Sequence, residues 1–238
     1  MQVTPYNTDQ SKKTQVEDMF DNIAPKYDLL NHVLSMKIDV LWRNNLVKWM
    51  RKDHPKLVLD VATGTGDLAI AVQKGLEAEV VGLDLSQQML NVGIDKIKKI
   101  NLSDKITMVK GDAENLTFED NKFDAVSVAF GVRNFENLEK GLAELRRVVK
   151  ENGSVFILEF SKVEGFLGPF YMFKNKNILP QIGKLVSKDN RAYTYLPDSV
   201  NAFPFGEKMK QILLDTGFKN VEYKKQSFGI ATIYKATK

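Results

Sequence analysis

The sequence contains no cysteine and only two histidines, His32 and His54. The missing thiols exclude a disulfide, a thiolate zinc site, an iron–sulfur cluster and a cysteine nucleophile. The two histidines lie far apart in the sequence, and neither forms a metal-ligand pattern with its neighbours. We therefore expect a site without a metal and a reaction without covalent catalysis through sulfur.

Long apolar runs and a strong net charge are also missing. No run approaches the roughly 20 residues of a membrane span, and the first residues lack the basic and apolar regions of a signal peptide. The net charge of +4 is too small for a nucleic-acid-binding surface, although it suits an anionic membrane surface or an acidic ligand. We expect a cytoplasmic protein with no nucleic-acid partner and, at 238 residues, one substantial core.

The most informative segment present is Val58-Leu-Asp-Val-Ala-Thr-Gly-Thr-Gly-Asp67. It has the pattern of a buried strand, a turn and the start of a helix, and Gly64 and Gly66 permit the positive φ and close ligand approach that such a turn needs. Asp84 ends the next apolar segment, about where a nucleotide-binding βαβ unit carries the acid that bonds a ribose. The segment predicts a site for an adenosine-containing cofactor.

Apolar and amphipathic segments alternate through the rest of the chain, which predicts an α/β fold with a mostly parallel sheet. Only about two residues separate the last two strands, so they should form an antiparallel hairpin. We expect an N-terminal helical region at 1–51 that caps the cofactor, and a cofactor-binding domain at 52–238 with a lid-like insertion at about 163–200. The predicted strands are 57–62, 79–84, 106–111, 123–130, 155–160, 220–225 and 228–235, and the predicted helices after residue 52 are 67–75, 86–100, 137–150 and 206–216.

The glycine loop by itself fits a dinucleotide site as well as S-adenosylmethionine. Asp60 precedes the loop, where it would repel a pyrophosphate but suits the ammonium and sulfonium groups of S-adenosylmethionine. Asp112 follows the third strand and can address an adenine edge. Each acid alone also fits a structural role, as a loop-bonding or turn residue. Three acids at the ends of successive strands favour S-adenosylmethionine, because ligands bind at that edge.

Several longer segments resemble the ubiquinone/menaquinone biosynthesis C-methyltransferase family, a group of class I S-adenosylmethionine-dependent methyltransferases. Two departures accompany the resemblance: Asp39 stands where the family usually carries a histidine before Trp42, and the usual Lys-Pro-Gly-Gly turn reads Lys150-Glu-Asn-Gly153. The segments that carry it are Phe20-Asp-Asn-Ile-Ala-Pro-Lys-Tyr-Asp-Leu-Leu-Asn31, Leu34-Ser35 with Trp42-Arg43, Asp60 to Asp67, Phe130-Gly-Val-Arg-Asn134 and Leu158-Glu-Phe-Ser161.

The resemblance implies a class I methyltransferase fold with a seven-stranded sheet and methyl transfer to a ring carbon of a polyprenylated quinol. Arg133 would stabilise a phenolate or polarise a water, Asn134 would orient that water or the quinol oxygen, and Asp112 or His32 would accept the proton. Arg133 also has a structural alternative, a surface ion pair with Asp124 or Glu136. The implied cofactor-binding residues are Asp60, Gly64, Thr65, Gly66, Asp84, Asp112, Ala113, Ala129 and Tyr27.

Demethylmenaquinol is the favoured acceptor, and the alternatives are the methoxy-polyprenyl benzoquinol of ubiquinone biosynthesis or another small molecule. A NAD-dependent oxidoreductase and a non-catalytic adenosine-binding module are the rival classes. The lysine- and aromatic-rich segment 165–188 predicts transient contact with the inner face of the cell membrane, against the alternative of a buried helical insertion. The sequence leaves open whether the protein forms a homodimer.

Overall fold

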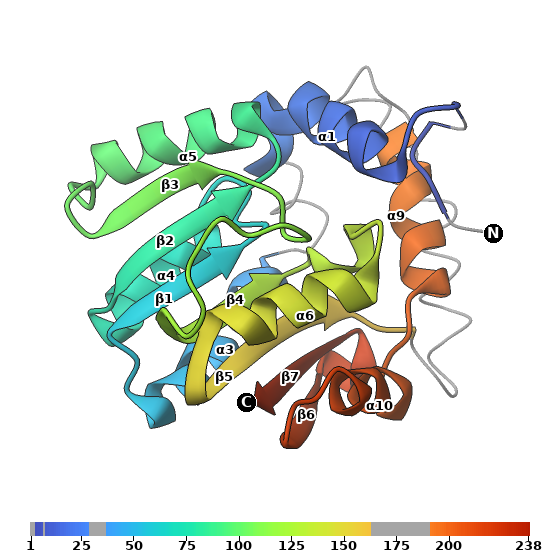
Figure 1. Ribbon diagram of the computed structural model, residues 1–238. Helices are drawn as coiled ribbons and strands as arrows, with labels where there is room; N and C mark the ends of the chain where they lie inside the picture. The colour runs from blue at the N-terminus through green and yellow to red at the C-terminus, as the bar shows by residue number, and fades with distance from the viewer. Residues whose placement is uncertain (1–2, 7, 29–36, 163–190) are drawn as a thin grey trace.

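A seven-stranded sheet forms the centre of the protein, for which the computed structural model describes residues 3–6, 8–28, 37–162 and 191–238 (Figure 1). The strand order is β3-β2-β1-β4-β5-β7-β6. All neighbouring strands pair in parallel except β7, which is antiparallel to both β5 and β6. The predicted parallel sheet with a terminal antiparallel hairpin is confirmed. The strands are β1 (Leu57–Val61), β2 (Glu79–Asp84), β3 (Ile106–Lys110), β4 (Phe123–Ala129), β5 (Val149–Phe160), β6 (Asn220–Gln226) and β7 (Ala231–Thr237).

Helices cover both faces of the sheet, because its central strands carry apolar side chains on both faces. Val58 packs in one core with residues of α3, α4 and α5, whereas its neighbour Leu59 packs in the other with residues of α6 and α10. The described helices of four residues or more are α1 (Lys12–Ile23), α3 (Ile38–Met50), α4 (Asp67–Leu76), α5 (Gln87–Lys99), α6 (Leu138–Val148), α9 (Arg191–Ala202) and α10 (Glu207–Asp215).

The main differences from the sequence prediction are the junction of α6 with β5, the start of β7 and the presence of α9. The helix predicted at 137–150 ends at Val148 because β5 begins at Val149, and Asn152 within that strand adopts a positive φ of 63°. The last strand begins at Ala231 rather than at residue 228, because the backbone of Ser227 and Phe228 is left-handed and cannot pair as a strand. Helix α9 was not predicted, since Pro197 interrupts its sequence pattern.

The N-terminal region lies across the carboxyl ends of the strands (Figure 1). Helix α1 begins after Ser11, whose hydroxyl accepts the Thr14 amide as an N-cap, and short 3₁₀ turns follow α1 at Ala24–Lys26 and α3 at Arg51–Asp53. Helix α9 lies beside α1. His32 and the segment 165–188 fall outside the described residues. Among the described helices, none has the length and apolar character of a membrane span.

Candidate active site

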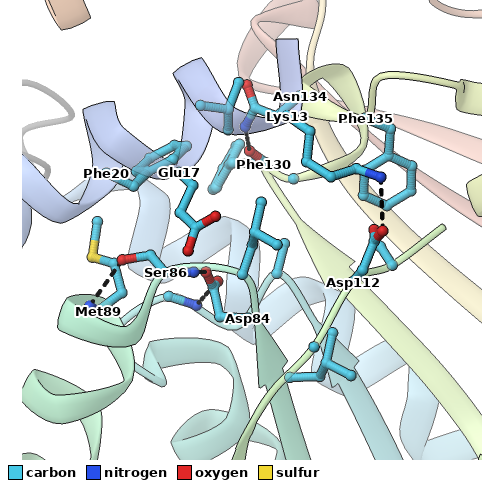
Figure 2. Close-up of a pocket in the computed structure, with 18 of the residues that line it drawn as sticks. Lys13, Glu17, Phe20, Asp84, Ser86, Met89, Asp112, Phe130, Asn134 and Phe135 are labelled. Carbon is cyan, nitrogen blue, oxygen red and sulfur yellow. Dashed lines mark hydrogen bonds and ion pairs between the residues drawn. The ribbon is translucent and has the colours of Figure 1, made fainter. Parts of the chain in front are cut away.

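A cavity that is partly open to solvent lies where β1, β2 and β4 end, under helix α1 (Figure 2). Ligands bind at this edge in open α/β sheets because the strand-to-helix loops diverge there. Its wall is mostly apolar, with a few carboxylate and amide groups. The predicted site residues that line it are Tyr27, Gly64, Asp84, Asp112, Ala113, Ala129 and Asn134.

The loop after β1 turns sharply and brings its backbone to the cavity. Gly64 and Gly66 have φ values of 57° and 81°, in the left-handed region that the sequence pattern predicts. Gly64 lines the cavity, whereas Gly66 caps the start of α4 and faces away from it. A Cβ on Gly66 would lie 3.5 Å from the Met108 side chain. The first glycine therefore leaves room for a ligand, and the second serves the turn.

Asp60 is buried beneath this loop and does not line the cavity. Its carboxylate accepts hydrogen bonds from the Thr63 hydroxyl at 2.6 Å and the Ser127 hydroxyl at 2.7 Å. Burial raises the pKa of Asp60 to about 6, against the opposing effect of the two hydroxyls. Asp60 therefore stabilises the loop through hydrogen bonds, and its charge can affect the cavity only as a long-range electrostatic effect.

Asp84 occupies the end of β2 and faces the cavity (Figure 2). Its carboxylate accepts hydrogen bonds from the backbone nitrogens of Gly64 at 2.7 Å and Ser86 at 2.9 Å. Burial raises the pKa of Asp84 to about 6, while the backbone donors act in the other direction. This carboxylate is held rigidly at the β1–β2 edge, in the position from which a ribose hydroxyl can be bound.

Asp112 and Ala113 follow β3 and line the cavity, and β2 separates β3 from β1 and its glycine loop in the sheet. One carboxylate oxygen of Asp112 accepts the Glu114 backbone nitrogen at 2.9 Å, and the other forms an ion pair with Lys13 at 2.7 Å. This ion pair joins α1 to the β3 loop. Lys13 was not among the predicted site residues.

Helix α1 is attached to the loop after β4 as well. The buried Lys12 ammonium donates to the backbone oxygens of Arg133 at 3.0 Å and Phe135 at 2.8 Å. Burial, followed by the charge of Arg133, lowers the pKa of Lys12 to about 8. Val16 and Phe20, on the same helix, also line the cavity. Two consecutive lysines therefore fix the roof of the cavity to two separate loops.

Thr65 lies outside the cavity wall, in a polar network behind the loop. Its hydroxyl donates to Asp28 at 2.6 Å and accepts from Lys96 at 3.1 Å. Lys96 forms further ion pairs with Asp28 and Asp67, each at 2.7 Å. Asp28 follows Tyr27, so this network anchors the segment that carries Tyr27 to the glycine loop.

Asp39 lies in a polar contact at the start of α3, where the family usually carries a histidine. Its buried carboxylate pairs with Arg43, one helical turn later. Arg43 also reaches Asp67 at 3.1 Å, at the start of α4. In this chain Asp39 therefore holds an arginine against the helix that follows the glycine loop.

Arg133 belongs to the 3₁₀ turn Val132–Asn134 and does not line the cavity. Its guanidinium pairs with Glu159 at 2.8 Å and donates to the Phe130 backbone oxygen, and both charged side chains are buried. The surface ion pair with Asp124 or Glu136, which was the structural alternative, is wrong, since Asp124 pairs instead with Lys150 at 2.6 Å. The Arg133 guanidinium therefore supports the turn from the protein interior and not from the cavity.

Asn134 is the member of this turn that faces the cavity (Figure 2). Its side-chain oxygen accepts a hydrogen bond from the Tyr195 hydroxyl at 3.1 Å, and its amide nitrogen lies 3.4 Å from the Phe130 backbone oxygen. Burial raises the pKa of Tyr195 to about 12, so the phenol stays protonated and donates. Tyr195 packs against Val16 of α1.

Sequence reasoning missed Glu159 and Tyr195 as partners of Arg133 and Asn134. An acid in the apolar strand Val155-Phe-Ile-Leu-Glu-Phe160 was a visible signal, because a buried charge needs a partner. Tyr195 gave no comparable signal, since its contact with residue 134 depends on how α9 returns to the sheet edge.

The strand order, with its antiparallel β7, and the position of the cavity define the fold of the class I S-adenosylmethionine-dependent methyltransferases. The cyclase SpnF has this fold at a TM-score of 0.70 and 17% identity, with 95% of this chain and 96% of that one covered. A SAM-dependent methyltransferase from Thermotoga maritima has a TM-score of 0.64 at 17% identity, with 93% and 99% covered.

The chain belongs to the ubiE/COQ5 methyltransferase family, which matches residues 8–238, and it is a methyltransferase. It is 48% identical to a demethylmenaquinone methyltransferase of Bacteroides fragilis, with 99% of this chain and 97% of the relative covered. A Geobacter sulfurreducens protein named ubiquinone/menaquinone biosynthesis C-methyltransferase UbiE is 44% identical, with 95% and 90% covered. The expected fold and family are confirmed.

Proposed function

We propose that this protein methylates a ring carbon of demethylmenaquinol with S-adenosylmethionine as methyl donor, the final step of menaquinone formation. The observation that carries the proposal is the cavity between Asp84 and Asn134, in a chain whose full-length relatives are named for this reaction. A cytoplasmic location at the inner face of the cell membrane accompanies it, because a polyprenyl tail belongs in the bilayer.

The residues of the cavity suit S-adenosylmethionine. Asp84 presents a carboxylate fixed by two backbone donors, which suits ribose hydroxyls. Asp112 and Ala113 lie one strand further along, where the adenine would follow, and Gly64 leaves open space at the methionine end. Buried beneath the loop, Asp60 supplies negative charge toward an ammonium and a sulfonium. S-adenosylmethionine supplies an electrophilic methyl group.

The chemistry asks the protein to orient a quinol and to move a proton. Loss of a phenolic proton raises electron density on the adjacent ring carbon, which forms the new carbon–carbon bond while the sulfur–methyl bond breaks. The ring carbon then releases its hydrogen as a proton while the phenolic oxygen regains one, so that one proton is released overall and S-adenosylhomocysteine leaves with the electron pair of the broken bond. Asn134 would hydrogen-bond the quinol oxygen or a water beside it. Arg133 would hold the turn in place through its hydrogen bond to the Phe130 backbone oxygen, and Glu159 balances its charge.

The experiment is transfer of labelled methyl from S-adenosylmethionine by the purified protein, with demethylmenaquinone supplied with and without a chemical reductant. Label in menaquinone that depends on the reductant supports the proposal, and the methoxy-polyprenyl benzoquinol is assayed in parallel. A preference for the benzoquinol would assign the alternative acceptor. Binding of NAD in place of S-adenosylmethionine, or no label on either quinol, would overturn the proposal.

Asn134→Ala supplies the site-specific arm, and Asn91→Ala is its matched control because Asn91 is an exposed asparagine on α5. We expect the first variant to lose methyl transfer by about 10- to 100-fold, as for a single positioning hydrogen bond in a transition state. The second should keep full activity. Equal activity of the two variants would remove Asn134 from the reaction.

A further inference from the structure

An apolar and basic surface lies at the start of α3 and the turn between β6 and β7, near the edge of the sheet at which the parallel strands end. Phe228 in this turn is 87% exposed, and Leu41 in the first turn of α3 is 55% exposed. Large apolar side chains with this exposure mark interaction surfaces when they gather at one place. The proposed function assigns no role to either residue.

Helix α3 runs alongside β6, and three contacts fix the alignment. The Trp42 indole nitrogen donates to the Ser227 hydroxyl at 2.8 Å, and Asn45 donates to Gln226 at 2.9 Å. Further along, the Lys224 ammonium lies 4.0 Å from the centre of the Trp49 ring. The amino-terminal end of the helix therefore meets the turn.

Leu41 and Phe228 lie next in sequence to residues that make these contacts, at the end of β6. Leu41 lies four residues before Asn45, and so on the same side of the helix. Phe228 follows Gln226 by two residues and has a φ of 59°, after Ser227 at 44°. Two consecutive non-glycine residues with a left-handed backbone conformation cost conformational energy, and in this turn they project the Phe228 ring into solvent.

An aromatic cluster links this surface to the cavity. Trp42 contacts Phe130 and Phe160, with ring centres 6.2 Å and 6.1 Å apart, and the two phenylalanine rings are 4.5 Å apart. Phe130 lines the cavity, and Phe160 pairs with Ala231, directly after the turn. Apolar side chains thus extend from the wall of the cavity to the exposed surface.

The exposed charges within the two segments that form the surface have one sign. In segments 37–48 and 224–230 every exposed charged residue is a lysine, because Asp39 and Arg43 are buried as a pair. Exposed apolar side chains surrounded by lysines complement an anionic bilayer, where the apolar groups enter the lipid and the ammonium groups meet phosphates. The exposed lysines are Lys37, Lys48, Lys224 and Lys225.

We propose that the surface formed by Leu41, Phe228 and the surrounding lysines docks the protein on an anionic lipid membrane, next to the entrance through which a lipid-borne acceptor reaches the cavity. That the acceptor comes from the membrane rests on the proposed function, whereas the docking of the protein on the membrane does not. The surface consists of described residues alone and does not include segment 165–188, which was expected from the sequence to contact the membrane.

The test is cosedimentation of the full chain with vesicles of equimolar phosphatidylglycerol and phosphatidylcholine, compared with phosphatidylcholine alone. We expect binding to the anionic vesicles that weakens with salt, and a partition coefficient about tenfold lower for the double variant Leu41→Ser, Phe228→Ser. The double variant Lys48→Gln, Lys225→Gln should bind less strongly to the anionic vesicles and should leave binding to phosphatidylcholine vesicles unchanged.

Ile100→Ser is the matched control, because Ile100 is 38% exposed and follows α5 at the opposite edge of the sheet. It should bind vesicles as the unmodified protein does, and circular dichroism should show that all variants fold. Unchanged binding of the double variant, or no binding of the unmodified protein, would overturn the proposal. A dimer that the double variant converts to monomers would assign the surface to a second copy and would overturn it too.

The vesicle assay contains no quinol, so its failure is separate from failure of the proposed reaction. In the activity assay, the double variant should lose methyl transfer to a long-tailed quinol held in anionic vesicles by about tenfold and keep transfer to a short-tailed quinol in solution. An equal loss with both acceptors would show damage to the site and would contradict docking.

Discussion

Acidification should weaken the binding of S-adenosylmethionine through Asp84. Burial raises the pKa of Asp84 to about 6, and its ionised form accepts hydrogen bonds from Gly64 and Ser86. A ribose hydroxyl needs the same acceptor. The ionised fraction falls from about one half at pH 6 to about one tenth at pH 5, so the Kd should rise about fivefold over that interval and change little above pH 7.

The variant Asp84→Asn isolates this effect, and calorimetric titration measures it. Losing a hydrogen bond to a charged group costs about 1.5–3 kcal/mol, which corresponds to about 10- to 150-fold in Kd at neutral pH. Burial also raises the pKa of Asp60 to about 6, so any pH dependence that the variant retains belongs to Asp60. Asp95→Asn, an exposed acid on α5, is the control. A Kd in Asp84→Asn within about twofold of the original, or a flat Kd down to about pH 5, would refute the reasoning.

Three further substitutions test the buried groups around the cavity. Because burial raises the pKa of Asp60 to about 6 from 3.8, Asp60→Asn should raise the free energy of unfolding by up to about 3 kcal/mol at neutral pH, and urea titration should show the gain vanishing as pH falls toward about 4, where the unmodified native state binds the proton. Glu159→Gln should lower stability by about 3–5 kcal/mol by leaving Arg133 charged and unpaired, and Arg133→Met in the same chain should restore part of it; equal stability of the single and double variants would contradict the pairing. Tyr195→Phe should reduce kcat several-fold with an unchanged Kd for S-adenosylmethionine, because about 1 kcal/mol of support for Asn134 is lost, whereas a changed Kd alone would contradict a positioning role.

The sheet and the cofactor edge could be predicted because their signals are local. Apolar segments such as Leu57–Val61 need burial on both faces, and Gly64 must follow such a strand for the chain to turn. The sequence thus locates Asp84 at a strand end without any knowledge of its contacts. Local signals failed at Phe228, which was predicted as part of a strand but has a left-handed backbone with a φ of 59°.

The roles within the site required the tertiary structure. Arg133 and Asn134 are adjacent in sequence, yet one is buried against Glu159 and the other faces the cavity. Lys13 reaches Asp112 across 99 positions of the chain, and Tyr195 reaches Asn134 across 61.

The sequence alone determined the fold class, the glycine turn, the acids at the strand ends and the family resemblance, because each depends on residue type and short-range spacing. Only the tertiary structure decided which of those polar groups face the cavity and which support it from behind. The physical reason is that a charge in the interior must be paired, and its partner is supplied by whichever segment the fold brings alongside.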